Sequence, residues 1–190
     1  MPDNPLVRLA HVAEDLTAAD RVVALMRPVA DVVLGDPTRR RLLQGEPLGH
    51  AAHPLLTDLP IGFWASASVL DLLAPRSSRK AADRLVGLGI LAAAPTALTG
   101  LADWSLGDRR VQRVGAVHAV LNVTALALYA TSWTLRRSGA RTAGVVTALV
   151  GAGVLGASGY LGGHMSFALK SPPPEAADPD ARTAATAPAV

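Results

Sequence analysis

The chain has 190 residues, of which half are hydrophobic and 17% are charged, and its formal net charge is +3. It contains no cysteine, which excludes disulfides, zinc fingers, thiol catalysis and cysteine-ligated iron–sulfur clusters within this chain. Its basic residues lie in short clusters beside apolar runs and not in one patch with interleaved aromatics, so we do not expect it to bind nucleic acid.

Residues 1–44 are predicted to form an amphipathic helical hairpin. Apolar residues recur at helical spacing over residues 4–34, and most acids and arginines fall on the other side. Asn4 and Pro5 suit the start of the first helix, whereas Thr17 and Asp20 resemble a capping box that starts the second. We expect an irregular linker over residues 35–53. The chain begins without the basic start and apolar core of a signal peptide, so the first spanning helix is expected to direct insertion.

Four apolar runs follow, each about as long as the 20 residues that cross the hydrocarbon core of a bilayer. The connections between them are short and each carries arginine, so neighbouring helices must be antiparallel. We therefore predict an all-α fold, an integral membrane four-helix up-down-up-down bundle over residues 45–168. The predicted spans cover roughly residues 54–74, 85–104, 114–135 and 142–167.

The last segment, residues 169–190, is rich in proline, alanine and acids, and we predict a disordered tail there. An even number of spans places both termini on one side of the membrane. Basic residues near the two faces balance, so the positive-inside rule does not choose a side. We place the termini in the cytoplasm because the N-terminal region carries no export signal.

Histidine and aspartate side chains collect toward the terminal side of the predicted bundle. The rise per residue places some of them at one depth, as an inner layer, and others about 7 Å further out. The inner layer comprises Asp58, Asp103 and His118, and the outer layer comprises His53 and His164, which His50 can join. Ionisable groups are costly inside a membrane, so we expect these side chains to turn inward and to be paired.

The third predicted span supports this reading. His118, Asn122, Tyr129 and Trp133 lie within about 60° on a helix of 3.6 residues per turn, so they form one stripe that faces the bundle. The fourth span carries regularly spaced glycines, which favour close helix packing in lipid or leave room for a flat macrocycle.

Four ordered motifs resemble a bacterial transmembrane family catalogued as domain of unknown function 2231. They begin with the segment from Gly49 to Trp64, and together they cover roughly residues 45–168. The other three motifs are residues 95–104, residues 118–122 and residues 159–164. The resemblance implies a four-helix domain in a bacterial inner membrane with His and Asp near one face, and it implies no established reaction. Some relatives resemble fusions to a Rieske-type iron–sulfur domain, which implies redox work. Because this chain has no cysteine, such an iron–sulfur or other redox partner would be a separate protein.

Three functions fit this pattern. The leading hypothesis is a b-type electron-transfer module that holds haem b between imidazoles of facing helices. Its candidate cofactor-binding residues are His53, His118, His164 and Asn122. The second is a site for a divalent transition metal such as zinc, iron or manganese. Its candidate ligands are His50, His53, Asp58, Asp103, His118 and His164.

The third function is a non-catalytic membrane scaffold or partner subunit. In that case the Asp and His side chains only lock the bundle, and the N-terminal helices form the docking surface. No soluble-enzyme motif is present, and no HExxH-type motif indicates hydrolysis. Whether the protein is an enzyme stays open, with redox chemistry favoured over hydrolysis, and no catalytic residue is assigned.

Overall fold

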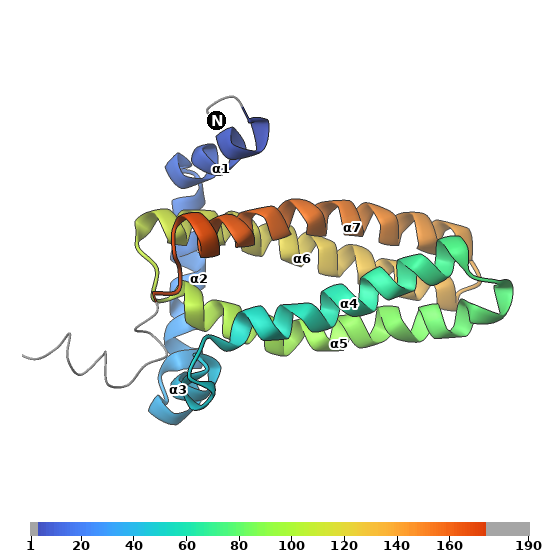
Figure 1. Ribbon diagram of the computed structural model, residues 1–190, viewed down its shortest axis with the longest axis horizontal. Coiled ribbons are helices and arrows are strands. Elements are labelled where there is room, and N and C mark those ends of the chain that lie inside the picture. The colour runs from blue at the N-terminus through green and yellow to red at the C-terminus, as the bar shows by residue number, and fades with distance from the viewer. Residues whose placement is uncertain (1–3, 174–190) are drawn as a thin grey trace, which may run out of the picture. The chain divides into compact units, whose positions relative to one another are not determined.

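The computed structural model describes residues 4–173, and the predicted tail lies outside them from residue 174 onward. Every regular element in that range is helical, which confirms the all-α prediction. Three short helices precede four long ones (Figure 1). The short helices are α1 (Pro5–Asp15), α2 (Ala19–Leu34) and α3 (Pro37–Leu43), and the long helices are α4 (Ala52–Leu73), α5 (Arg79–Trp104), α6 (Arg109–Arg137) and α7 (Arg141–Gly163). Single turns η1 (Glu46–Leu48), η2 (Arg76–Ser78) and η3 (His164–Ala168), the last of them π-helical, complete the described chain.

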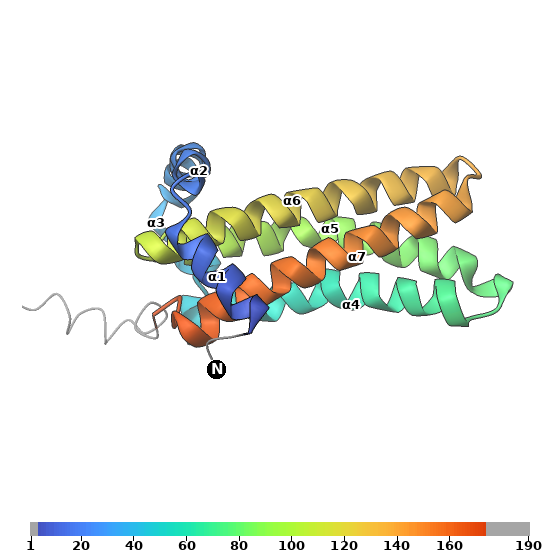
Figure 2. The ribbon, with the colours of Figure 1, turned by 90° about the horizontal axis from the view of Figure 1, so that it is seen from above.

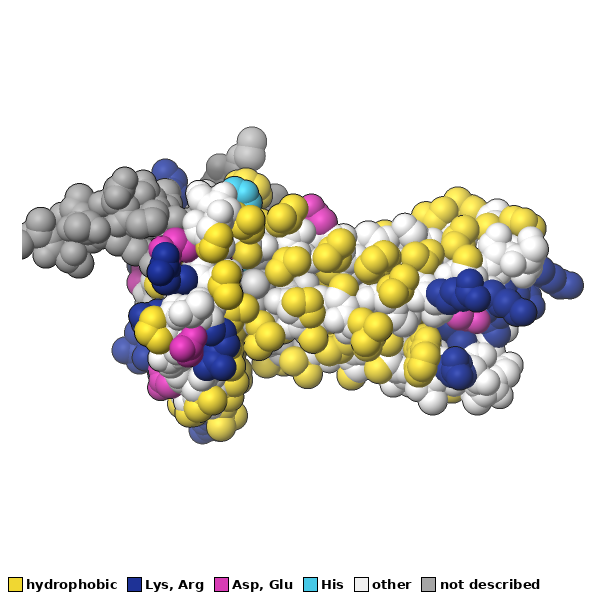
Figure 3. Space-filling model, turned by 90° about the horizontal axis from the view of Figure 1, so that it is seen from below, with side chains coloured by type: hydrophobic (Ala, Val, Ile, Leu, Met, Phe, Trp, Pro, Cys, Tyr) yellow, Lys and Arg dark blue, Asp and Glu magenta, His cyan; other side chains and the backbone are white. Residues whose placement is uncertain are grey.

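The four long helices have the length and composition of membrane spans, and the search that found them covered the described residues. Large apolar side chains are exposed on each of them, for example Val69 on α4, Leu91 on α5, Val123 on α6 and Val150 on α7. Figure 3 shows such side chains spread over the long helices. In water this surface would be an aggregation hazard, whereas lipid tails cover it without cost.

The contacts within the chain define two units, which share the long helices between them. Unit 1 comprises Met1–Leu55, Ala97–Val117 and Leu161–Val190, and unit 2 comprises Leu56–Thr96 and His118–Tyr160. Unit 2 therefore contains only segments of α4, α5, α6 and α7, joined in pairs by short connections. Figures 1 and 2 both show these segments running side by side, so unit 2 is the predicted antiparallel four-helix bundle.

The centre of unit 2 is built around Trp64 of α4. Its indole stacks on the ring of Tyr129 from α6 with 4.0 Å between centroids, and its Nε1–H donates to the carbonyl of Val86 on α5. A Cβ at Gly89 would lie 2.2 Å from Trp64 Nε1, so only glycine lets α5 approach the indole this closely. Ala148 of α7 completes a core to which all four helices contribute.

The glycines of α7 behave differently from our expectation. Gly153, Gly156 and Gly159 are exposed, and a Cβ built at each would meet no atom within 4 Å. The prediction that these three glycines serve close packing is therefore wrong for contacts within the described chain. Gly151 is not part of this three-residue spacing, and it does lie near Tyr129.

Unit 1 contains the short helices and the adjoining ends of the long ones. Val23 and Leu34 of α2 pack against Trp104 of α5 and Ala116 of α6, which makes the apolar face of α2 part of a second core. This confirms that the N-terminal region is helical and amphipathic.

Two local predictions for unit 1 are wrong. The N-cap of α2 is Ala18, which makes no side-chain capping bond, so Thr17 and Asp20 form no capping box. The predicted irregular linker contains α3, whose N-terminus is capped by Asp36 through a 2.7 Å bond from the Arg39 amide. Asp36 before Pro37 is the usual signature of a helix start, and that signal was present in the sequence.

Candidate functional site

The candidate site in unit 1 begins with His53, in the first turn of α4. Its Nδ1 lies 3.5 Å from the hydroxyl oxygen of Thr99 on α5, at the outer limit of a hydrogen bond. A Cβ at Gly100 would lie 2.7 Å from the ring carbon Cε1 of His53, so the ring occupies the space that a larger residue would fill. Thr99 and Gly100 therefore hold the imidazole against α5.

Asp103 lies one turn beyond Thr99 on the same face of α5. Its side chain is buried, with the residue only 6% exposed. Neither Oδ1 nor Oδ2 has a hydrogen-bond partner among the described residues. Buried polar atoms are nearly always hydrogen-bonded, so two unpartnered oxygens on one carboxyl group demand an explanation. The expectation that Asp103 turns inward is met, but the expectation that it is paired within the chain is not.

His164 begins the π-helical turn after α7, and its partner comes from α1. Its Nε2–H donates to Oε1 of Glu14 at 2.8 Å, and both side chains are only 10% exposed. The ring of His11 lies edge-on to His164 with 6.2 Å between centroids. Sequence reasoning missed Glu14. Its signal was its place on the apolar face of α1, one turn after the buried Ala10.

His118 lies in unit 2 and is held by a complete hydrogen-bond network. Its Nδ1–H donates to the carbonyl of Ser158 on α7 at 2.8 Å, and the side-chain amide of Asn122 lies 2.8 Å from its Nε2. The hydroxyl of Ser158 donates to Oδ1 of Asn122 at 3.0 Å. The predicted inward stripe on α6 is thus confirmed for His118 and Asn122, and also for the buried Tyr129, whereas Trp133 is 36% exposed. Both imidazole nitrogens already have partners in the protein.

The remaining predicted ligands are exposed. Asp58 lies in the interior of α4 with an exposed side chain, so the expectation that it turns inward is wrong. His50 is exposed in the turn before α4, where its Nδ1 lies 3.1 Å from the carbonyl oxygen of Ala51. Among residues 4–173, no three His, Asp or Glu side chains are grouped as the ligands of one metal ion.

Comparison with known proteins gives a family. A family described as "Predicted membrane protein (DUF2231)" matches residues 49–171, which is more than half of the chain. The chain belongs to this family. The matched range contains all four long helices together with His53, Asp103, His118 and His164, and it leaves α1, α2 and α3 outside.

No curated protein and no solved structure matches the chain. The family description states membrane location and no reaction, ligand or cofactor. The helices α1 to α3, which supply Glu14 and the buried face of α2, lie outside the matched range. Any function must be argued from the side chains themselves.

Proposed function

We propose that this membrane protein binds a cation in unit 1, with Asp103 of α5 as the binding carboxylate. The observation that carries the proposal is the burial of both Asp103 oxygens without a hydrogen-bond partner among the described residues. An ionised carboxylate that is buried and unpaired is destabilising by several kcal/mol, on the order of the cost of breaking a buried ion pair. A bound cation, either a proton or a metal ion, removes that cost.

The neighbouring groups support the same chemistry. Thr99 lies one turn before Asp103 on α5, and the imidazole of His53 lies against Thr99 and Gly100. This end of α5 therefore carries a hydroxyl and an imidazole as well as the carboxylate. Mixed imidazole and oxygen donors suit zinc, iron or manganese. In membrane proteins, ionisable side chains inside the spans also serve as proton relays, which is the second source of a cation.

Haem b remains a prediction with less support from the geometry. An axial ligand must present a ring nitrogen to the iron, and both nitrogens of His118 already face Ser158 and Asn122. Electron transfer and a separate iron–sulfur partner likewise remain predictions, as do the cytoplasmic termini and the inner membrane.

The test compares Asp103→Asn with wild type in lipid nanodiscs. Asparagine keeps the shape of the side chain but removes the negative charge. Asp58→Asn is the matched control, because it removes a carboxylate from an exposed position of another spanning helix. Three readouts apply to each protein: metal analysis after equilibration with zinc, iron(II) or manganese, a visible spectrum, and the infrared C=O band of a protonated carboxyl group.

Each outcome has one reading. Stoichiometric metal that falls at least tenfold in Asp103→Asn, but not in Asp58→Asn, supports a metal cation. A protonated-carboxyl band that disappears only in Asp103→Asn supports a proton. The proposal fails if Asp103→Asn matches wild type in both metal content and the infrared band. A Soret band in the visible spectrum would instead indicate that the protein binds haem.

A further inference from the structure

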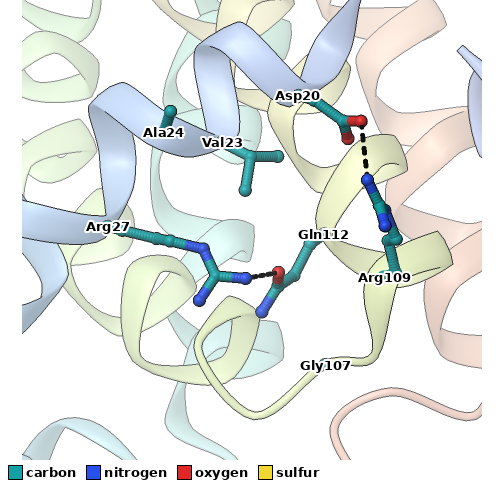
Figure 4. Close-up of a pocket in the computed structure, with 7 residues that line it drawn as sticks. All are labelled: Asp20, Val23, Ala24, Arg27, Gly107, Arg109 and Gln112. Carbon is teal, nitrogen blue, oxygen red and sulfur yellow. Dashed lines mark hydrogen bonds and ion pairs between the residues drawn. The ribbon is translucent and has the colours of Figure 1, made fainter. Parts of the chain in front are cut away.

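A second feature of unit 1 lies away from Asp103. A cavity of about 520 Å³ opens between α2 and the start of α6, and Figure 4 shows its lining. Its polar lining groups are Asp20, Arg27, Arg109 and Gln112, and Val23 contributes an apolar wall. Pockets of this size, within the usual range of roughly 300–1,000 Å³, hold small molecules or molecular headgroups.

The charges around this cavity do not cancel. Asp20 is engaged by Arg113, with bonds of 2.8 Å to both of its oxygens, and by Arg109 at 3.1 Å. The described partner of Arg27 is the uncharged Gln112, whose Oε1 accepts from Nη2 at 2.7 Å. No carboxylate of the described residues lies within 4.0 Å of the Arg27 guanidinium. The cavity lining therefore holds one carboxylate and two guanidinium groups, and the Arg27 guanidinium has further N–H groups that can donate to a ligand.

Arginine donors at a cavity rim select a class of ligand. A guanidinium presents parallel N–H groups that match the oxygens of a phosphate, so the pair of Arg27 and Arg109 fits a phosphate group better than a simple halide. Arg27 comes from α2 and Arg109 from the first turn of α6, so the two donors approach the cavity from different elements.

The rest of α2 indicates where such a phosphate would come from. At about 100° per residue, Asp20, Ala24 and Arg27 share one side of the helix. Leu25, Val29 and Val32 share another side and are exposed, with Leu25 at 73% and Val32 at 75%. A helix with a buried face, an exposed apolar strip and arginines beside it is typical of a segment that lies in the membrane interface.

We propose that this cavity binds the phosphate group of an anionic ligand through Arg27 and Arg109, and that a phospholipid headgroup is its natural source. The proposal does not depend on a cation at Asp103. It concerns α2, which lies outside the residues that match the family, and the α2–α6 cavity.

The test is isothermal titration calorimetry of the full chain in a non-ionic detergent. Dihexanoyl phosphatidic acid is the first probe, inorganic phosphate the second, and dihexanoyl phosphatidylcholine the zwitterionic comparison. Arg27→Gln removes the guanidinium, whereas Arg21→Gln is the matched control. Arg21 is also an exposed arginine of α2, but it does not line the cavity.

We expect phosphatidic acid to bind saturably to wild type and about tenfold or more weakly to Arg27→Gln, the loss typical of one charge-assisted hydrogen bond. The affinity of Arg21→Gln for phosphatidic acid should stay within about twofold of wild type. Arg27→Lys should lose an intermediate amount of affinity, because lysine keeps the charge but lacks the parallel N–H groups of the guanidinium. Equal Arg27-dependent binding of inorganic phosphate would assign the site to free phosphate. The proposal is overturned if neither probe binds saturably, or if Arg21→Gln weakens binding as much as Arg27→Gln does.

Discussion

Arg136 of α6 and Asp71 of α4 form a bidentate ion pair inside unit 2, with 3.0 Å from Nη1 to Oδ1 and 2.5 Å from Nη2 to Oδ2. The Arg136 side chain is 0% exposed and that of Asp71 is 2% exposed. Arg141 and Asp83 complete the cluster, so two guanidinium groups face two carboxylates and the charges balance. Such a cluster ties α4, α5, α6 and α7 together near their short connections.

Removing Asp71 should therefore destabilise the bundle. Asp71→Asn leaves Arg136 buried with one carboxylate fewer, and breaking a buried pair in this way costs about 3 kcal/mol or more. We expect the thermal unfolding midpoint in detergent to fall by several degrees. Arg84→Gln, an exposed change on α5 with no described ion pair, is the control and should shift stability by less than about 0.5 kcal/mol. Equal midpoints for Asp71→Asn and wild type would show that the cluster contributes nothing.

Asp20 should make the docking of α2 sensitive to acid. The Arg113 guanidinium, and then that of Arg109, hold the pKa of Asp20 well below its ordinary value of 3.8. The ionised form is thus favoured in the folded state, so its contribution to stability is complete above the ordinary pKa and declines as the pH falls through the lowered one.

The measurement is the difference in unfolding midpoint between wild type and Asp20→Asn as a function of pH. We expect a constant difference from pH 7 to about pH 5, and a shrinking one below about pH 4. Asp31→Asn, an exposed change on the same helix without a described ion pair, should differ from wild type by a small amount at every pH. A difference that grows on acidification would contradict the assignment of the pair.

The length of the apolar runs was sufficient to predict the four long helices. An apolar run of span length has few alternatives, because every backbone polar group in lipid must be bonded within its own helix. The short helices were harder, since their boundaries depend on single residues. Asp36 caps α3 and was overlooked, whereas Thr17 and Asp20 had the form of a cap and Ala18 took that position.

The sequence predicted which residue types form the candidate site, but it did not predict the rotation of every side chain or the partner of each. Depth along the helices predicted one shared level for Asp58, Asp103 and His118, but depth carries no information about rotation. Asp58 therefore proved exposed while Asp103 is buried. The partner of His164 could not be read from local sequence, because Glu14 lies 150 positions away along the chain.

The network around His118 gives a separate prediction about unit 2. Ser158→Ala removes a buried hydroxyl that donates to Asn122 and lies 2.9 Å from His118 Nδ1. Leaving buried polar partners unsatisfied costs about 1–3 kcal/mol, so the unfolding midpoint should fall. Ser66→Ala, at an exposed position of α4, is the control. If Ser158→Ala and Ser66→Ala both unfold at the same midpoint as wild type, the network does not stabilise unit 2, and His118 becomes a candidate ligand again.

The hydrogen bond between Glu14 and His164 should anchor α1. Glu14→Gln keeps the size of the side chain but weakens the 2.8 Å bond to Nε2, and a charge-assisted bond of about 1.4 kcal/mol corresponds to a tenfold change in a local opening equilibrium. Hydrogen exchange of amides in α1 should therefore be about tenfold faster in Glu14→Gln, whereas Asp15→Asn, its exposed neighbour, should leave the rates close to wild type.

The same Glu14→Gln variant also tests His164 as a metal ligand. A metal-bound imidazole commonly donates its other N–H to a carboxylate. Faster α1 exchange together with a loss of bound metal would therefore show that His164 binds the metal and that Glu14 orients its ring. Faster exchange with unchanged metal content would make the pair an anchor alone, and unchanged exchange would show that α1 is held by its apolar contacts instead.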